Sequence, residues 1–168
     1  MYESVTTPKP RRDRMMLVLI LAAVVLIVSV TPPIFIALSA SYRYHNFVLD
    51  FSNDLVDARR HGTITLTEDG KTDTVSSDAV SVMFVKLTDY GLGQPLKEPP
   101  DSPCFSISLP NGTVLTLYDT PQEPPEDSDD PIPRGTTVYY APAEGKPFIY
   151  LQRQLRYQDA VSLLHMGE

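Results

Sequence analysis

The chain of 168 residues has a net charge of −7, which is divided unevenly along its length. Residues 1–14 hold four basic and two acidic side chains, a net of +2, and the remainder holds ten basic and nineteen acidic side chains, a net of −9. Such an acidic remainder argues against a nucleic-acid partner. The single cysteine, Cys104, excludes an intramolecular disulfide and a thiolate zinc site.

An apolar segment follows the basic start of the chain. No Asp, Glu, Lys, Arg or His lies between Arg14 and Arg43, and Met15–Val30 is apolar apart from Ser29. A helix rises about 1.5 Å per residue, so this segment is long enough to cross a hydrocarbon core of roughly 30 Å. We therefore predict a transmembrane anchor over residues 15–40, with the lipid bilayer as its partner.

The same segment has features of a cleaved signal peptide. In this interpretation Pro32 and Pro33 break the helix, and the small residues Ala37 and Ser39 could bracket a cleavage site near residue 39. In an anchor, the two prolines are tolerated as a kink near the outer end of the helix. The apolar run is longer than the usual signal core of roughly 7–15 residues, and the residues after the prolines are apolar again. These two features favour an uncleaved anchor over a secreted, processed protein.

Four basic side chains set the predicted orientation: Lys9, Arg11, Arg12 and Arg14. The side of a membrane protein that is rich in Lys and Arg remains cytoplasmic. We therefore expect residues 1–14 to be a cytoplasmic tail of a single-pass protein of the cell membrane. The C-terminal domain is then extracytoplasmic.

A second helix is predicted over residues 46–60. Apolar residues recur on one of its faces at helical spacing, and Gly62 follows its end. These apolar residues are Phe47, Val48, Phe51, Leu55 and Ala58. We assign residues 41–62 to a membrane-proximal stalk that holds the folded domain away from the bilayer.

Residues 63–168 are expected to form a small α+β domain. Alternating β-branched residues predict a hairpin over 63–75 that turns at Glu68-Asp69-Gly70, and Asn111-Gly112 predicts the turn of a second hairpin over 105–118. Two further strands are predicted, over 136–141 and 147–151. The predicted fold is an antiparallel sheet of about six strands with one face packed on two or three helices.

Two helices are predicted within this domain. The first covers residues 78–90, is capped by Ser77, and has apolar residues at spacings of three and four. The second covers residues 157–166 at the end of the chain.

Residues 119–135 contain five prolines and an acidic cluster, so we predict a long mobile loop there. The cluster consists of Glu126, Asp127, Asp129 and Asp130. Its carboxylates are suitable calcium ligands, but the glycine and the distal glutamate of an EF-hand loop are absent. A solvated loop is the favoured interpretation.

The sequence contains no recognisable catalytic constellation. The three histidines, His45, His61 and His165, lack metal-ligand neighbours at i+3 or i+4, and no phosphate loop, nucleotide fingerprint or nucleophile-elbow motif is present. Cys104 is interpreted as an inert, partly buried thiol. We therefore predict a protein that is not an enzyme and that uses neither a cofactor nor a metal.

The last two predicted strands carry aromatic residues on both faces: Tyr139, Tyr140, Phe148 and Tyr150. One face must pack in the core, and the other is a candidate partner surface, with cross-strand pairing as the alternative. The leading hypothesis is a membrane-anchored, extracytoplasmic binding module for an envelope or membrane protein. The alternatives are an accessory subunit of a larger membrane complex and a secreted protein.

Overall fold

The computed structural model describes residues 11–121 and 134–165. Lys9 and the acidic cluster at residues 126–130 lie outside these ranges, as does most of the predicted acidic loop. The chain divides into two compact units, residues 1–40 and residues 41–168. Each unit is described by itself below.

The described part of the first unit belongs to the helix α1, Arg11–His61. An 18-residue window of α1 has a mean hydropathy of 2.7 and is not buried at all inside the structure. Its large apolar side chains are exposed, for example Leu21 at 63% and Phe35 at 71%. Within the described residues, α1 is the one helix that is long and apolar enough to cross a membrane.

The helix α1 continues through Pro32 and Pro33, where the signal-peptide interpretation places a helix break. Each proline removes one backbone donor, but the hydrogen bonds of the turns on either side remain, and apolar helices tolerate such losses. The hydroxyls of Ser29 and Thr31 donate to backbone carbonyls four residues earlier, so these polar groups are paired within the helix itself. The helix break of the signal-peptide interpretation is therefore not observed, and the apolar segment and the helix predicted over 46–60 form one element.

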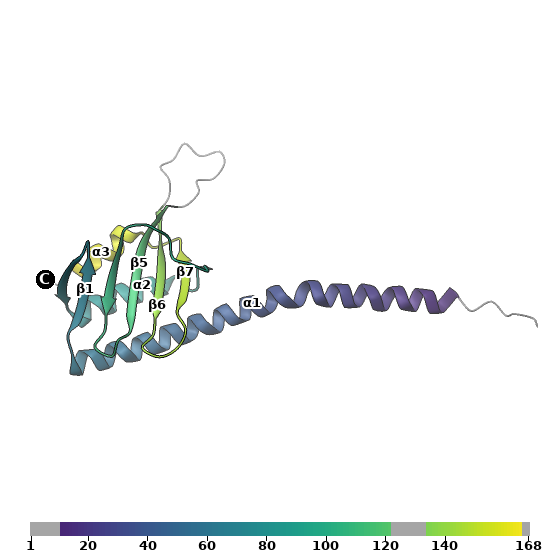
Figure 1. Ribbon diagram of the computed structural model, residues 1–168, viewed down its shortest axis with the longest axis horizontal. Coiled ribbons are helices and arrows are strands. Elements are labelled where there is room, and N and C mark those ends of the chain that lie inside the picture. The colour runs from purple at the N-terminus through teal and green to yellow at the C-terminus, as the bar shows by residue number, and fades with distance from the viewer. Residues whose placement is uncertain (1–10, 122–133, 166–168) are drawn as a thin grey trace, which may run out of the picture. The chain divides into compact units, whose positions relative to one another are not determined.

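The second unit contains a seven-stranded antiparallel sheet with the strand order β2-β1-β4-β5-β6-β7-β3 (Figure 1). The strands are β1 (Ile64–Glu68), β2 (Lys71–Val75), β3 (Gln94–Pro95), β4 (Cys104–Ser108), β5 (Val114–Pro121), β6 (Arg134–Ala141) and β7 (Phe148–Gln152). Three helices contribute to the described part of this unit. They are α2 (Ser77–Asp89), α3 (Tyr157–His165) and the C-terminal part of α1. The prediction of an α+β fold built on an antiparallel sheet is confirmed.

The turn of the first hairpin has the backbone conformation that its residues favour. Asp69 and Gly70 have φ angles of 49° and 75°, and the pair Glu68↔Lys71 closes the hairpin on either side of them. Two successive left-handed residues match the right-handed twist of the flanking strands. Residues 69 and 70 thus fix the register of β1 against β2.

The strand β3 was not predicted from the sequence, because it lies within a proline-rich segment that carries no strand pattern. It pairs with β7 at the edge of the sheet, and the connection to β4 then passes β7, β6 and β5 (Figure 1). The backbone approaches β7 closely at Gly93, where a Cβ atom would lie 2.0 Å from the carbonyl oxygen of Leu151. A proline is tolerated in β3 because an edge strand need not donate every ladder hydrogen bond.

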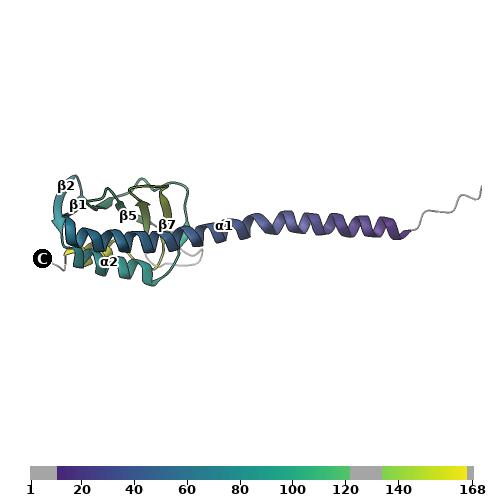
Figure 2. The ribbon, with the colours of Figure 1, turned by 90° about the horizontal axis from the view of Figure 1, so that it is seen from below.

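The helices cover one face of the sheet, as Figure 2 shows for α1 and α2. Alternate residues of the strands point toward them, so that Leu66, Ile107, Leu115 and Tyr140 are aligned across β1, β4, β5 and β6 and are all buried. On the part of α1 that belongs to the second unit, the core residues are Phe47, Phe51, Leu55 and Ala58. The residues that we assigned to a stalk are therefore part of the core, because their apolar face needs a partner and the sheet supplies one.

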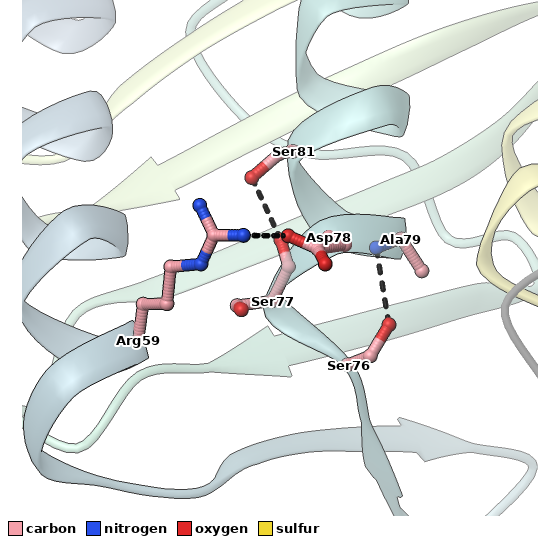
Figure 3. A network of polar contacts seen from close by, with 6 residues as sticks. All are labelled: Arg59, Ser76, Ser77, Asp78, Ala79 and Ser81. Atoms are coloured by element: carbon pink, nitrogen blue, oxygen red, sulfur yellow. Dashed lines mark hydrogen bonds and ion pairs between the residues drawn. The ribbon is translucent and has the colours of Figure 1, made fainter.

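We predicted Ser77 as the N-terminal cap of α2, but the structure shows that the cap is Ser76. The Ser76 backbone is extended and its hydroxyl accepts a hydrogen bond from the Ala79 backbone N–H at 3.1 Å (Figure 3). Asp78 in the first turn pairs with Arg59 of α1 at 2.6 Å. Both side chains of this ion pair are well exposed, so the cap contributes more to stability than the pair does.

Candidate functional site

The four aromatic residues predicted as a partner surface lie on opposite faces of the sheet. Tyr140, Phe148 and Tyr150 are at most 4% exposed and belong to the core beneath the helices. Tyr139 lies on the other face, aligned with Thr116 of β5, and is half-buried. Tyr140, Phe148 and Tyr150 therefore lie on the face that packs in the core and do not contribute to an exposed partner surface, and Tyr139 alone among the four lies on the other face.

These three rings surround Phe47 of α1. The ring centroid of Phe47 lies 4.9 Å from that of Tyr140, 5.9 Å from that of Tyr150 and 6.4 Å from that of Phe148. The guanidinium of Arg43 lies 5.1 Å from the centroid of the Phe148 ring and donates to the carbonyl of Pro147. The aromatic residues thus hold residues 43–51 of α1 against the end of the β6–β7 hairpin.

Two adjoining hollows open to solvent beside this contact. Both are lined by Asp50, Tyr140, Pro142 and Glu144. The first hollow, about 410 Å³ in volume, also includes Asn53, Asp54 and Asn111, and we call it the acidic hollow. The second hollow, about 330 Å³ in volume, extends instead to Arg43, Lys146 and Phe148, and we call it the mixed hollow.

The acidic hollow combines residues from three separate regions of the chain: α1, the β4–β5 turn, and the end of β6 with the turn that follows it. Asp50 and Asp54 are one turn apart on α1, and Glu144 lies in the turn between β6 and β7. Among the described residues that line it, three are carboxylates and none is basic. Its local charge is therefore strongly negative and attracts a cation.

Thr113 positions two of the polar side chains in the acidic hollow. Its hydroxyl, on a fully buried side chain, donates to Asp54 Oδ2 at 2.7 Å and accepts from the Ala143 backbone N–H at 3.2 Å. Its backbone N–H donates to Asn111 Oδ1 at 2.9 Å. One hydroxyl thus connects α1, the β4–β5 turn and the β6–β7 turn.

The substitution Thr113→Val should lower the free energy of unfolding by about 1–3 kcal/mol, because it leaves buried hydrogen-bonding groups without their partner. Chemical denaturation of the full chain in detergent micelles measures this loss. Thr113→Ser is the control, since it keeps the hydroxyl and removes only a methyl group. Equal stability of Thr113→Val and the unsubstituted chain would contradict the role of this hydroxyl.

The hydroxyl of Tyr140 is buried and has no hydrogen-bond partner among the described residues. Burial raises the pKa of Tyr140 to about 12, and the negative charges of Asp54 and Asp50 contribute to the increase. The phenol therefore remains neutral at physiological pH. A neutral hydroxyl can accept a hydrogen bond from an incoming donor.

The described residues contain no group of three His, Cys, Asp or Glu side chains placed to hold a metal ion. The carboxylates of the acidic hollow are thus not arranged as a metal site. Cys104 is half-buried at the start of β4, and His165 lies 3.7 Å from Glu68. Neither Cys104 nor His165 is among the described residues that line the acidic hollow.

Sequence reasoning did not identify the acidic hollow. The spacing of Asp50 and Asp54 places them on one helix face, and this is the only local signal. Glu144 and Tyr140 are about ninety residues away in the chain and belong to a different element. Their proximity follows from the packing of α1 on β6, which the sequence pattern does not show.

Comparison of the chain with protein-family models, with curated proteins and with solved structures finds no match. The structure itself defines the class of protein. It is an α+β protein with a seven-stranded antiparallel sheet and one long apolar N-terminal helix that is suited by length and composition to cross a membrane.

Proposed function

We propose that the protein is a non-catalytic binding module, anchored in a cell membrane by the N-terminal part of α1. The observation that carries this proposal is the apolar window of α1, whose side chains have no protein partner within the structure. Exposure of such a surface to water costs about 25 cal/mol per Å² of apolar area, whereas lipid chains accommodate it. A membrane is the environment that removes this cost.

The proposed orientation places residues 41–168 on the extracytoplasmic side. Four basic residues precede the apolar window, and the domain that follows it is acidic. Short basic segments are retained on the cytoplasmic side during insertion. The domain then presents its two hollows to partners outside the cytoplasm.

Labelling of single cysteines tests this orientation. In a chain with Cys104→Ser, one cysteine is introduced either in the tail, by Thr6→Cys, or on the exposed strand β2, by Asp73→Cys. A membrane-impermeant maleimide added to intact cells should label Asp73→Cys and should label Thr6→Cys only after detergent lysis. The reverse pattern would overturn the orientation.

Intact mass spectrometry of the membrane fraction provides the second measurement. A mass that includes residues 1–40 is expected for an anchored protein. A shorter product in the soluble fraction would show that the N-terminal segment is cleaved. The protein would then be a secreted module instead of an anchored one. Intact chain recovered entirely from the cytosol would overturn the proposal.

A further inference from the structure

We propose that the acidic hollow binds the guanidinium or ammonium group of a basic side chain from a protein partner. This inference rests on the proposed function of a binding module and names the chemistry that the module recognises. The contacts that support it come from α1, the β4–β5 turn, β6 and the β6–β7 turn.

The first support is the charge of the hollow. Asp50, Asp54 and Glu144 line it together, and no basic side chain among the described lining residues offsets them. Within the described parts of the chain, Asp54 is the one of these three that accepts a hydrogen bond from a neighbouring side chain, that of Thr113. A bound cation would reduce the repulsion among the three carboxylates and would form charge-assisted hydrogen bonds with them.

The second support is independent of charge. Tyr140 is only 3% exposed, lines the same hollow and has a buried hydroxyl without a hydrogen-bond partner among the described residues. Buried polar groups in folded proteins are normally paired, so the Tyr140 hydroxyl is available for a hydrogen bond with a group that enters the hollow. Because the adjacent carboxylates are acceptors, a group that contacts them together with this hydroxyl should supply several donors.

Guanidinium and ammonium groups fit these requirements better than a metal ion. The three carboxylates are not placed to coordinate one ion together. A guanidinium carries five donors in a planar fork, and an ammonium carries three, so either can reach separated acceptors. The amides of Asn53 and Asn111 provide further acceptor oxygens at the wall of the hollow.

The mixed hollow favours a protein segment over a small free amine. It shares four lining residues with the acidic hollow and continues to Phe148, Arg43 and Lys146. An extended segment with a basic side chain in the acidic hollow could place an apolar and an acidic side chain in the mixed hollow. A free amine would leave these groups unused.

Binding is tested with the full chain in nanodiscs of zwitterionic lipid, which avoids competition from anionic headgroups. The probe is an acetylated and amidated hexapeptide that contains one arginine, followed by a leucine and a glutamate. Its control replaces the arginine with citrulline, which has nearly the same shape but no charge. Nuclear magnetic resonance shifts of the amides at residues 50–54, 111–113 and 140–144 are expected with the arginine peptide only.

The double substitution Asp50→Asn and Glu144→Gln should weaken the binding of the arginine peptide about tenfold. The matched control is Asp73→Asn with Glu98→Gln, which removes the same charges from residues that do not line either hollow. Tyr140→Phe should weaken binding several-fold without loss of folded stability, because it removes only a hydroxyl that has no partner in the described part of the chain. Added salt should weaken binding further.

Several results would overturn the proposal. These are equal binding of the citrulline peptide, unchanged affinity in the hollow variant, and an absence of shifts at millimolar arginine peptide. Competition by free putrescine as strong as that by the peptide would show a small-amine site instead, and saturable binding of calcium at these residues would show a metal site. If the chain labels as expected in the topology experiment but does not bind the peptide, this inference alone is rejected. If the chain binds the peptide but is found in the cytosol, the anchored function alone is rejected.

Discussion

Phe47→Ala should lower the free energy of unfolding by about 3–5 kcal/mol, the usual cost of removing a fully buried aromatic side chain. Phe47 is 1% exposed. Its ring lies within 6.4 Å, between centroids, of the rings of six other residues. These residues are Tyr44, Phe51, Phe84, Tyr140, Phe148 and Tyr150.

A loss of this size is a large fraction of the ~5–15 kcal/mol that stabilises a typical domain. Unfolding of the full chain by denaturant in micelles can be followed by tyrosine fluorescence, because the chain has no tryptophan. Leu49→Ala is the matched control, since Leu49 lies two residues along the same helix and is 49% exposed. Its effect should remain within about 0.5 kcal/mol.

The comparison of these two variants distinguishes two interpretations of residues 46–60: a helix packed in the core and a stalk outside it. If residues 46–60 only held the domain away from a membrane, Phe47→Ala and Leu49→Ala would have similarly small effects. A large effect confined to Phe47→Ala is expected from the packing of α1 on β6 and β7. Similar small effects for both variants would contradict that packing.

The double substitution Leu21→Asp and Val25→Asp should remove the chain from the membrane fraction. Each aspartate near the centre of a spanning helix costs about 2.5–3.5 kcal/mol of insertion free energy. Together they should shift the partition toward water on the order of 10⁴-fold. Acidic residues contribute little to topology, so the effect reports insertion rather than reversed orientation.

Fractionation followed by extraction at alkaline pH measures the amount of chain that remains with the lipid. The control is Leu49→Asp with Val56→Asp, which makes the same chemical change at two half-exposed positions of α1 in the second unit. This control should stay in the membrane fraction. Full retention of the Leu21→Asp, Val25→Asp variant would show that the apolar window is not inserted in lipid.

Local patterns of the sequence were sufficient for the elements whose signals lie within a few neighbouring residues. The Asp69-Gly70 turn, the apolar face of α2 and the hairpin of β4 and β5 all occur where they were predicted. The same is true of the long apolar stretch in α1. Each of these features depends on residues that are close in sequence, so periodicity and turn chemistry are enough to reveal it.

The proline pair at residues 32 and 33 shows where such local rules fail. A proline predicts a helix end when no other interaction opposes it, but α1 continues through both of them. The short strand β3 shows the opposite error, because two residues that include a proline carry no strand signal of their own. Its pairing with the edge of β7 is what makes it a strand.

By itself, the sequence determined the presence of one apolar helix suited to a bilayer, the acidic character of the domain after it, and the α+β class of that domain. Only the tertiary structure decided that residues 47–58 are core rather than stalk, and that Tyr140, Phe148 and Tyr150 are covered. It also brought Asp50 and Asp54 beside Glu144 and the unpaired hydroxyl of Tyr140. The physical reason is that burial and proximity depend on which distant surfaces pack together, whereas periodicity records only which residues share a face.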